Sequence, residues 1–129
     1  MRKKISVIGK GVQIARELSR ITDVTDDVRG ADVVVLAADG DLAEIARSAP
    51  AAAVVVTGED LESRCKTAYE GLLFPRSRII GVSDPGRVSD AVASIVFDGD
   101  DAHDVIAMKD GDFTACSARL GRGGIRELL

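Results

Sequence analysis

The stretch ISVIGKGVQIAREL, residues 5–18, decides how the N-terminal part of this chain folds. It begins with a mostly apolar run of strand length, which ends at Gly9. Gly9 and Gly11 then form a two-glycine turn. Ile14 and Leu18 follow four residues apart, the spacing of an apolar stripe on an amphipathic helix. The stretch therefore predicts a buried strand, a glycine turn and a helix, in that order.

This order is how a dinucleotide-binding Rossmann fold begins. The candidate cofactor-binding residues are Gly9, Lys10, Gly11 and Val12, because backbone amides at a helix N-terminus attract an anion. The third glycine of the usual fingerprint is replaced by Ile14. Two interpretations stay open: the turn binds NAD(H) or another phosphate ligand, or it serves packing alone.

Strand and helix patterns alternate along the next part of the chain. Such alternation predicts a parallel sheet with right-handed crossovers. We expect the strands in the spatial order 21–25, 4–8, 31–38, 53–57 and 78–83, with helices over 41–49, from 61 and over 88–96. The predicted fold class is α/β: a single Rossmann-like three-layer domain with a mostly parallel sheet plus a C-terminal β-hairpin.

The pattern changes after residue 97. An acidic loop is expected at residues 98–104, and the strand-like runs 105–109 and 113–120 flank Asp110-Gly111, a strong hairpin signal. The glycine-rich residues 121–124 are expected to form a tight turn, and 125–129 a short tail. We therefore treat 1–129 as one domain, with a βα core over 1–97 and the acidic loop, hairpin and tail over 98–129.

Composition limits the classes of partner. The 129 residues are 46% hydrophobic, 29% charged and 3% aromatic, as in a globular protein with an aliphatic core. The net charge of −4 does not favour binding to nucleic acid.

The two cysteines predict free thiols. Cys65 lies on an apolar helical stripe, which predicts a buried thiol, and Cys116 is too distant in sequence to form a metal-type pair with it. No signal peptide or membrane span is predicted, so we expect a cytoplasmic protein.

Several segments resemble the lactate/malate dehydrogenase family in condensed form. The more specific ones are the FPRSRIIG and LGRGGI stretches. The matching segments are KISVIGKG (4–11), ITDVTDD (21–27), ADVVVL (31–36), AVVVT (53–57), FPRSRIIG (74–81) and LGRGGI (120–125). The resemblance implies NAD(H) as cofactor and an oxidoreductase of malate or lactate dehydrogenase type.

The positions that carry the family's chemistry depart from its pattern. The acidic second strand that holds the cofactor ribose has no counterpart, and the loop with catalytic arginines is absent. Arg87 and Asp90 stand where the family places an aspartate and an arginine, so the charges are exchanged. The Gly-Gly-His-Gly-Asp motif is also absent, and His103 lies displaced from its place.

We therefore assign no catalytic residue and no metal site. His103 and Arg87 are the two catalytic candidates, since hydride transfer to an oxo acid needs an acid/base and a cationic clamp. Their simpler interpretations are an acidic surface loop around His103 and a helix cap at Arg87. Two alternatives stay open: a cation site of Asp98, Asp100, His103 and Asp104, and an anion-binding turn with Arg119, Arg122 and Arg126.

Two functions follow as hypotheses. The leading one is a minimal, non-catalytic relative of these dehydrogenases that works as a structural or interaction module, with a homo-oligomer or another protein as partner. The alternative is an NAD(P)- or nucleotide-binding, oxidoreductase-like protein that uses the Gly9–Gly11 turn. Neither involves nucleic acid or a membrane.

Overall fold

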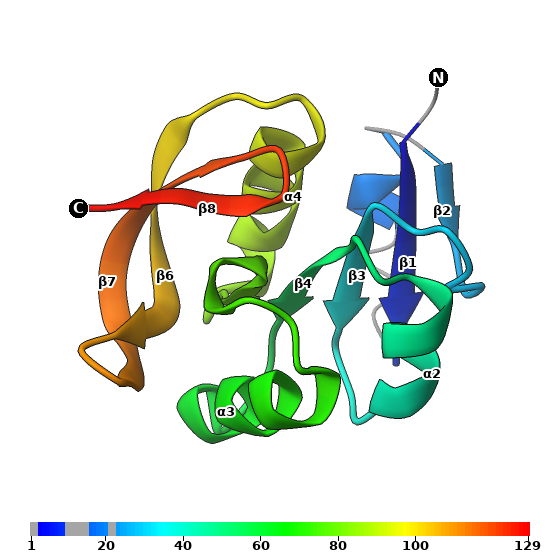
Figure 1. Cartoon of the computed structure of the whole chain (residues 1–129). Coiled ribbons are helices and arrows are strands. Elements are labelled where there is room, and N and C mark those ends of the chain that lie inside the picture. Colours follow the sequence, from blue (N-terminus) through cyan, green and yellow to red (C-terminus); the bar gives the residue numbers. More distant parts are fainter. Residues whose placement is uncertain (1–2, 10–15, 21–22) are drawn as a thin grey trace.

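The computed structural model describes residues 3–9, 16–20 and 23–129. One sheet of eight strands organises this part of the chain, in the order β2-β1-β3-β4-β5-β6-β7-β8 (Figure 1). The strands are β1 (Lys4–Ile8), β2 (Asp23–Thr25), β3 (Val33–Leu36), β4 (Ala53–Val56), β5 (Ile79–Gly81), β6 (Asp101–Lys109), β7 (Asp112–Gly121) and β8 (Gly124–Leu128). The helices are α2 (Leu42–Ser48), α3 (Leu61–Leu72) and α4 (Val88–Val96), with 3-10 turns η1 (Arg76–Arg78) and η2 (Pro85–Arg87).

The first five strands are parallel, and their order confirms the order predicted from the sequence. All residues of β3 and β4 are buried, which explains their continuous apolar runs: a strand covered on both faces needs no polar side chain. Residues 16–18 are helical, as expected from the opening stretch, and Leu18 is buried. Lys10, Gly11, Val12 and Ile14 lie outside the described residues.

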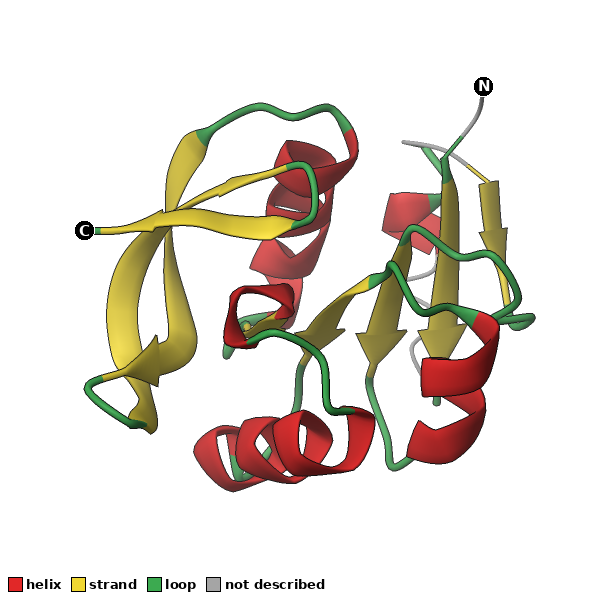
Figure 2. Ribbon diagram, viewed as in Figure 1, coloured by secondary structure: helices red, strands yellow, loops and turns green. Residues whose placement is uncertain are grey.

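The predicted fold class is wrong. The sheet is mixed, because β5–β6, β6–β7 and β7–β8 pair antiparallel, and strand residues outnumber helical residues in the described part of the chain. Figure 2 shows that the C-terminal strands β6, β7 and β8 make up a large part of the sheet. The short turns after β6 and after β7 require the strands they join to run antiparallel. The antiparallel β5–β6 pair has no such turn, because α4 lies between these strands in the chain, and its direction depends on contacts between distant segments.

The C-terminal segment also differs in detail from its prediction. The Asp110-Gly111 hairpin is confirmed, with φ of 55° and 91° at these two residues. The acidic loop is shorter than expected, because β6 begins at Asp101. The expected tail is strand β8, which the tight turn at Arg122 and Gly123 joins to β7.

Two apolar clusters hold the sheet, one on each face. Helix α4 packs on one face through Val88, Val92 and Ile95, together with Leu120 of β7. Helices α2 and α3 pack on the other face, where they meet Phe113. Both clusters include residues of the parallel strands and of the antiparallel strands, so the two parts of the sheet share their cores. No helix in the described ranges has the length and apolar character that crossing a bilayer requires.

Candidate functional site

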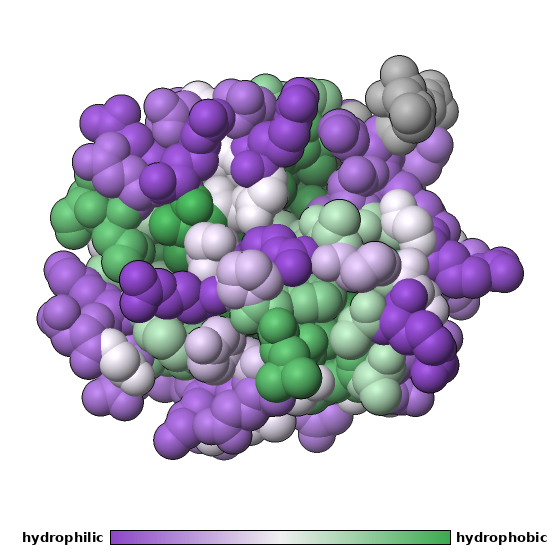
Figure 3. Space-filling view, in the orientation of Figure 1, coloured by the Kyte–Doolittle hydropathy of each residue, from purple (hydrophilic) through white to green (hydrophobic). Residues whose placement is uncertain are grey.

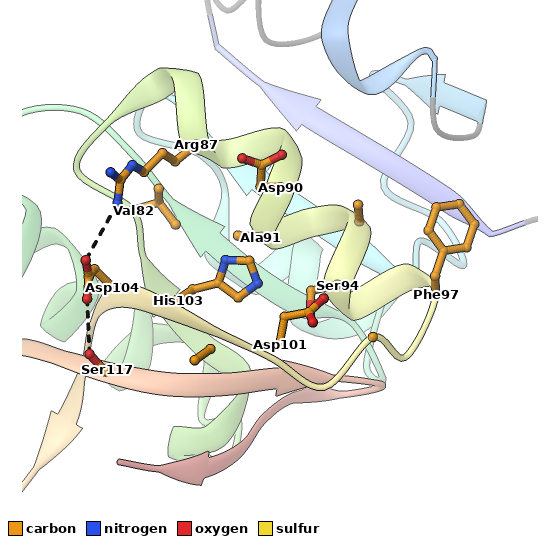
Figure 4. Close-up of a pocket in the computed structure, with 13 residues that line it drawn as sticks. Val82, Arg87, Asp90, Ala91, Ser94, Phe97, Asp101, His103, Asp104 and Ser117 are labelled. Carbon is orange, nitrogen blue, oxygen red and sulfur yellow. Dashed lines mark hydrogen bonds and ion pairs between the residues drawn. The ribbon is translucent and has the colours of Figure 1, made fainter.

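A groove of about 740 Å³ lies between α4 and the N-terminal half of β6 (Figure 4). Arg87 and Asp90 line it from the start of α4, and His103 and Asp104 line it from β6. In Figure 4, His103 lies in the middle of the groove, with Arg87 towards one end and Phe97 towards the other. The structure therefore brings the two catalytic candidates, His103 and Arg87, into one site.

The groove exists because β6 extends beyond its neighbour. Strand β5 pairs with β6 only at Gly81 and Ile106, so residues 101–105 continue past this point beside α4. Asp84 begins the turn on the other side, where its side chain accepts a hydrogen bond of 2.9 Å from the Gly86 amide. This turn places Arg87 at the N-cap of α4, facing β6.

Arg87 is already engaged by carboxylates. Its Nε lies 3.8 Å from Asp84 Oδ2, and its Nη1 lies 3.6 Å from Asp104 Oδ2. Asp104 also accepts a hydrogen bond of 3.0 Å from Ser117 Oγ. The side chains of Arg87 and Asp104 are 62% and 79% exposed, so each ion pair contributes less than about 1 kcal/mol.

His103 is placed differently from its prediction. It lies on strand β6 opposite Ala118, not in an acidic surface loop, and its ring is half-buried. Its Nε2 atom is shielded from solvent and has no hydrogen-bond partner among the described residues. A shielded polar atom without a partner is unusual in a folded protein and marks His103 as the chemically distinctive group of the groove.

The groove does not fit the substrate that the family resemblance implies. A small oxo acid needs a free cation for its carboxylate, whereas Arg87 has two aspartates as partners. Asp90 and Asp101 add two further carboxylates to the lining. An anionic ligand would meet net repulsion here.

The alternative cation site is also not formed. In the described part of the chain, no group of three or more His, Cys, Asp or Glu side chains is arranged to hold a metal ion. Asp98 instead accepts a hydrogen bond of 2.8 Å from the Arg122 amide and pairs with Arg126. Asp100 lies 4.0 Å from Arg119. The guanidinium groups of Arg119 and Arg126 are thus engaged by carboxylates, whereas Arg122 contributes its backbone amide.

The glycine turn after β1 is explained by packing where the structure describes it. Gly9 has φ of 103°, and a Cβ on this residue would lie 2.6 Å from Ala38 Cβ and 2.8 Å from the Ala38 amide nitrogen. Only glycine fits this approach to the end of β3. The other proposed cofactor-binding residues, Lys10, Gly11 and Val12, lie outside the described ranges.

Arg64 is a residue that the sequence reasoning missed. Its guanidinium donates hydrogen bonds to the carbonyl oxygens of Thr57 and Leu36, at the carboxyl ends of β4 and β3. It lies over Gly58, where a Cβ would be 2.7 Å from Arg64 Nη1. The one signal in the sequence is that Arg64 lies in the first turn of the helix that follows Thr57-Gly58-Glu59. From there a long side chain can reach back to the strand ends. Arg64 thus lies at the edge of the sheet where open parallel sheets bind ligands, and it lines a cavity of about 150 Å³ there.

Neither cysteine is placed for chemistry in the groove. Cys65 is fully buried in the cluster under α3, as the sequence predicts, and burial raises the pKa of its thiol to about 12. It therefore stays protonated and unreactive at neutral pH. Cys116 is half-buried, and both thiols are free.

Comparison of the chain with models of known protein families and with curated proteins finds no match to either.

Proposed function

We propose that this protein is a non-catalytic relative of the lactate/malate dehydrogenases that works as an interaction module, with a homo-oligomer as its active form. The observation that carries the proposal is Leu73, which follows α3. Its side chain is 85% exposed and its backbone has φ of 59°. A position of this kind normally holds glycine, because a left-handed conformation costs other residues roughly 1–2 kcal/mol.

Leu73 thus carries a backbone cost without any packing gain inside one subunit. The residues on either side, Leu72 and Phe74, are buried. Figure 3 shows hydrophobic surface between α3 and η1, with hydrophilic groups along its lower edge. Covering a leucine side chain with a second subunit would contribute roughly 1.5–3 kcal/mol, which offsets the backbone cost. A twofold interface would use Leu73 twice.

The absence of dehydrogenase chemistry is supported by the groove. Arg87 is neutralised by Asp84 and Asp104, so no free cation stands beside His103 among the lining residues. The free thiols of Cys65 and Cys116 support a reducing compartment, and we include a cytoplasmic location in the proposal.

Leu73→Asn tests the proposal. Asparagine tolerates the left-handed conformation, so the subunit should fold as well as the wild type. Loss of two buried leucines from a dimer interface should raise the dissociation constant roughly 100-fold or more. Sedimentation equilibrium measures this constant. Leu129→Asn is the matched control, since Leu129 is also exposed but lies at the end of β8. A wild type that is monomeric at high micromolar concentration would contradict the proposal.

The nucleotide-binding alternative retains one favourable observation: Gly9 adopts a positive φ directly after β1, as a phosphate-binding turn requires. Calorimetric titration with NADH separates the two functions. We expect no heat of binding at about 1 mM NADH, because the proposed interaction module uses no nucleotide. A cofactor role would require a dissociation constant below this concentration. A sub-millimolar dissociation constant would reverse the ranking, whatever the oligomeric state.

A further inference from the structure

The groove between α4 and β6 has a charge pattern that selects its ligands. Asp90 and Asp101 line it, and the carboxylate of neither has a hydrogen bond or ion pair with another described residue. Asp104 is the one lining carboxylate with a cationic partner, Arg87. Two carboxylates are therefore available to a ligand, whereas the guanidinium of Arg87 is already shared between aspartates.

An aromatic side chain lies at the end of the groove away from Arg87. Phe97 follows α4 directly, is 64% exposed and is among the lining residues. The face of an exposed aromatic ring attracts organic cations and covers apolar groups. The half-buried Ala93 and the exposed Ala102 add apolar surface to the lining.

We propose that this groove binds a small organic cation, an amine that carries an aromatic or apolar body. The ammonium group would contact the carboxylate of Asp101, while Asp90, on the other side of His103, adds to the negative potential of the groove. The apolar body would lie against Phe97. Such a mixture of a few polar groups and apolar wall is typical of ligand sites. The half-buried ring of His103 would lie beside the ligand and report its presence. This inference does not depend on the proposed oligomer, because Leu73 does not line the groove.

The site should be weak for a small probe, because its carboxylates are exposed and its groove is open. Benzylammonium carries the two required features, a ring and one positive charge. We expect it to bind with a dissociation constant on the order of 1 mM at low ionic strength. Benzyl alcohol and benzoate have the same ring with no charge and with a negative charge. Both should bind at least tenfold more weakly.

Nuclear magnetic resonance of the His103 imidazole is the direct readout, because His103 is the only histidine in the chain. Each compound is titrated into the full-length protein at constant pH and salt. A saturable shift of the ring signals with benzylammonium, and a much weaker response to the other two compounds, is the expected result. Equal responses to all three compounds, or no shift up to about 10 mM benzylammonium, would overturn the inference.

Two variants locate the interaction. Asp90→Asn combined with Asp101→Asn should weaken benzylammonium binding about tenfold, because the charge-assisted contact and the negative potential are lost. Asp110→Asn combined with Asp112→Asn is the charge-matched control, since both residues are exposed and neither lines the groove. Circular dichroism checks that each variant is folded. Unchanged affinity in the double variant of Asp90 and Asp101 would show that these carboxylates do not form the site.

Discussion

Gly9 and Leu73 both have positive φ, but for different physical reasons. Gly9 needs it because the chain passes within contact distance of Ala38, where no side chain fits. Leu73 ends α3 with a left-handed residue and exposes its side chain. At Gly9 the close contact with Ala38 is by itself enough to require glycine. At Leu73 no packing within the subunit explains the left-handed backbone, and for this reason the proposed interface rests on Leu73.

Gly9→Ala tests the packing explanation. The new methyl group would meet Ala38 and would also strain a backbone with φ of 103°, so we expect a loss of about 2–4 kcal/mol in the free energy of unfolding. Urea denaturation followed by circular dichroism measures it. Gly111→Ala is the control for strain alone, because φ is 91° there and nothing lies within 4 Å of a Cβ. Equal losses in the two variants would contradict a steric role for Ala38.

At the scale of elements, Asp98 joins the segment after α4 to the turn between β7 and β8. Its carboxylate accepts a hydrogen bond from the Arg122 amide and forms an ion pair with Arg126. Ser94 of α4 supports the same junction through a buried hydrogen bond of 2.6 Å to the Leu120 carbonyl. Together these contacts hold the β7–β8 hairpin against α4. Strand β6 pairs with β7, so its position depends on the same contacts.

The pKa of Asp98 is therefore lowered from its usual value near 3.8, first by the Arg122 amide and then by Arg126. A carboxyl group with a depressed folded-state pKa stabilises the fold above its unfolded-state pKa and loses this effect as the pH falls through the folded value. Asp98→Asn should thus be less stable than the wild type at pH 7, and the two should converge below about pH 3.8.

Thermal unfolding of both proteins between pH 7 and pH 2.5 measures this convergence. Asp110→Asn is the matched control, because Asp110 also has a positive φ and no ion pair with a described residue. Its difference from the wild type should not depend on pH in the same way. A stability gap for Asp98→Asn that stays constant down to pH 2.5 would rule out the contribution of the charge.

At the scale of the whole molecule, the parallel and antiparallel strands form one folding unit. Leu120 of β7 lies in the same apolar cluster as Ile5 of β1 and Val92 of α4. On the other face, Tyr69 of α3 contacts Phe113 of β7 edge to face, with ring centroids 5.8 Å apart. Each core thus depends on segments from both ends of the chain, so neither half should unfold alone.

Leu120→Ala tests this cooperativity. The side chain is fully buried, so its truncation should cost about 2–5 kcal/mol. Far-ultraviolet circular dichroism follows the strands, and fluorescence of Tyr69, the only tyrosine, follows the α3–β7 contact. Both signals should shift together to lower urea concentration, as in a two-state transition. Separate transitions would show that the C-terminal strands form a domain of their own. Leu129→Ala, at an exposed site, should change stability by less than about 0.5 kcal/mol.

Local features were predictable from the sequence. Continuous apolar runs predicted β3 and β4, and Asp110-Gly111 predicted the hairpin, because a buried strand and a tight turn each depend on a few consecutive residues. The stripe that includes Leu61 and Cys65 predicted α3 in the same way. The fold class was not predictable in this way, since the direction of β6 relative to β5 and the strand character of β8 depend on contacts between distant segments.

The site shows the same division. The sequence by itself determined which groups could do chemistry, because His103 is the only histidine and Arg87 stands at the start of an evident helix. Only the tertiary structure decided that the two share a groove, that Asp84 and Asp104 engage Arg87, and that Arg64 binds carbonyls of β3 and β4. These outcomes depend on β6 extending past β5 and on hydrogen bonds across 28 residues of chain, as from Arg64 to Leu36. Such long-range contacts form only when distant segments pair in the sheet, so no local sequence pattern encodes them.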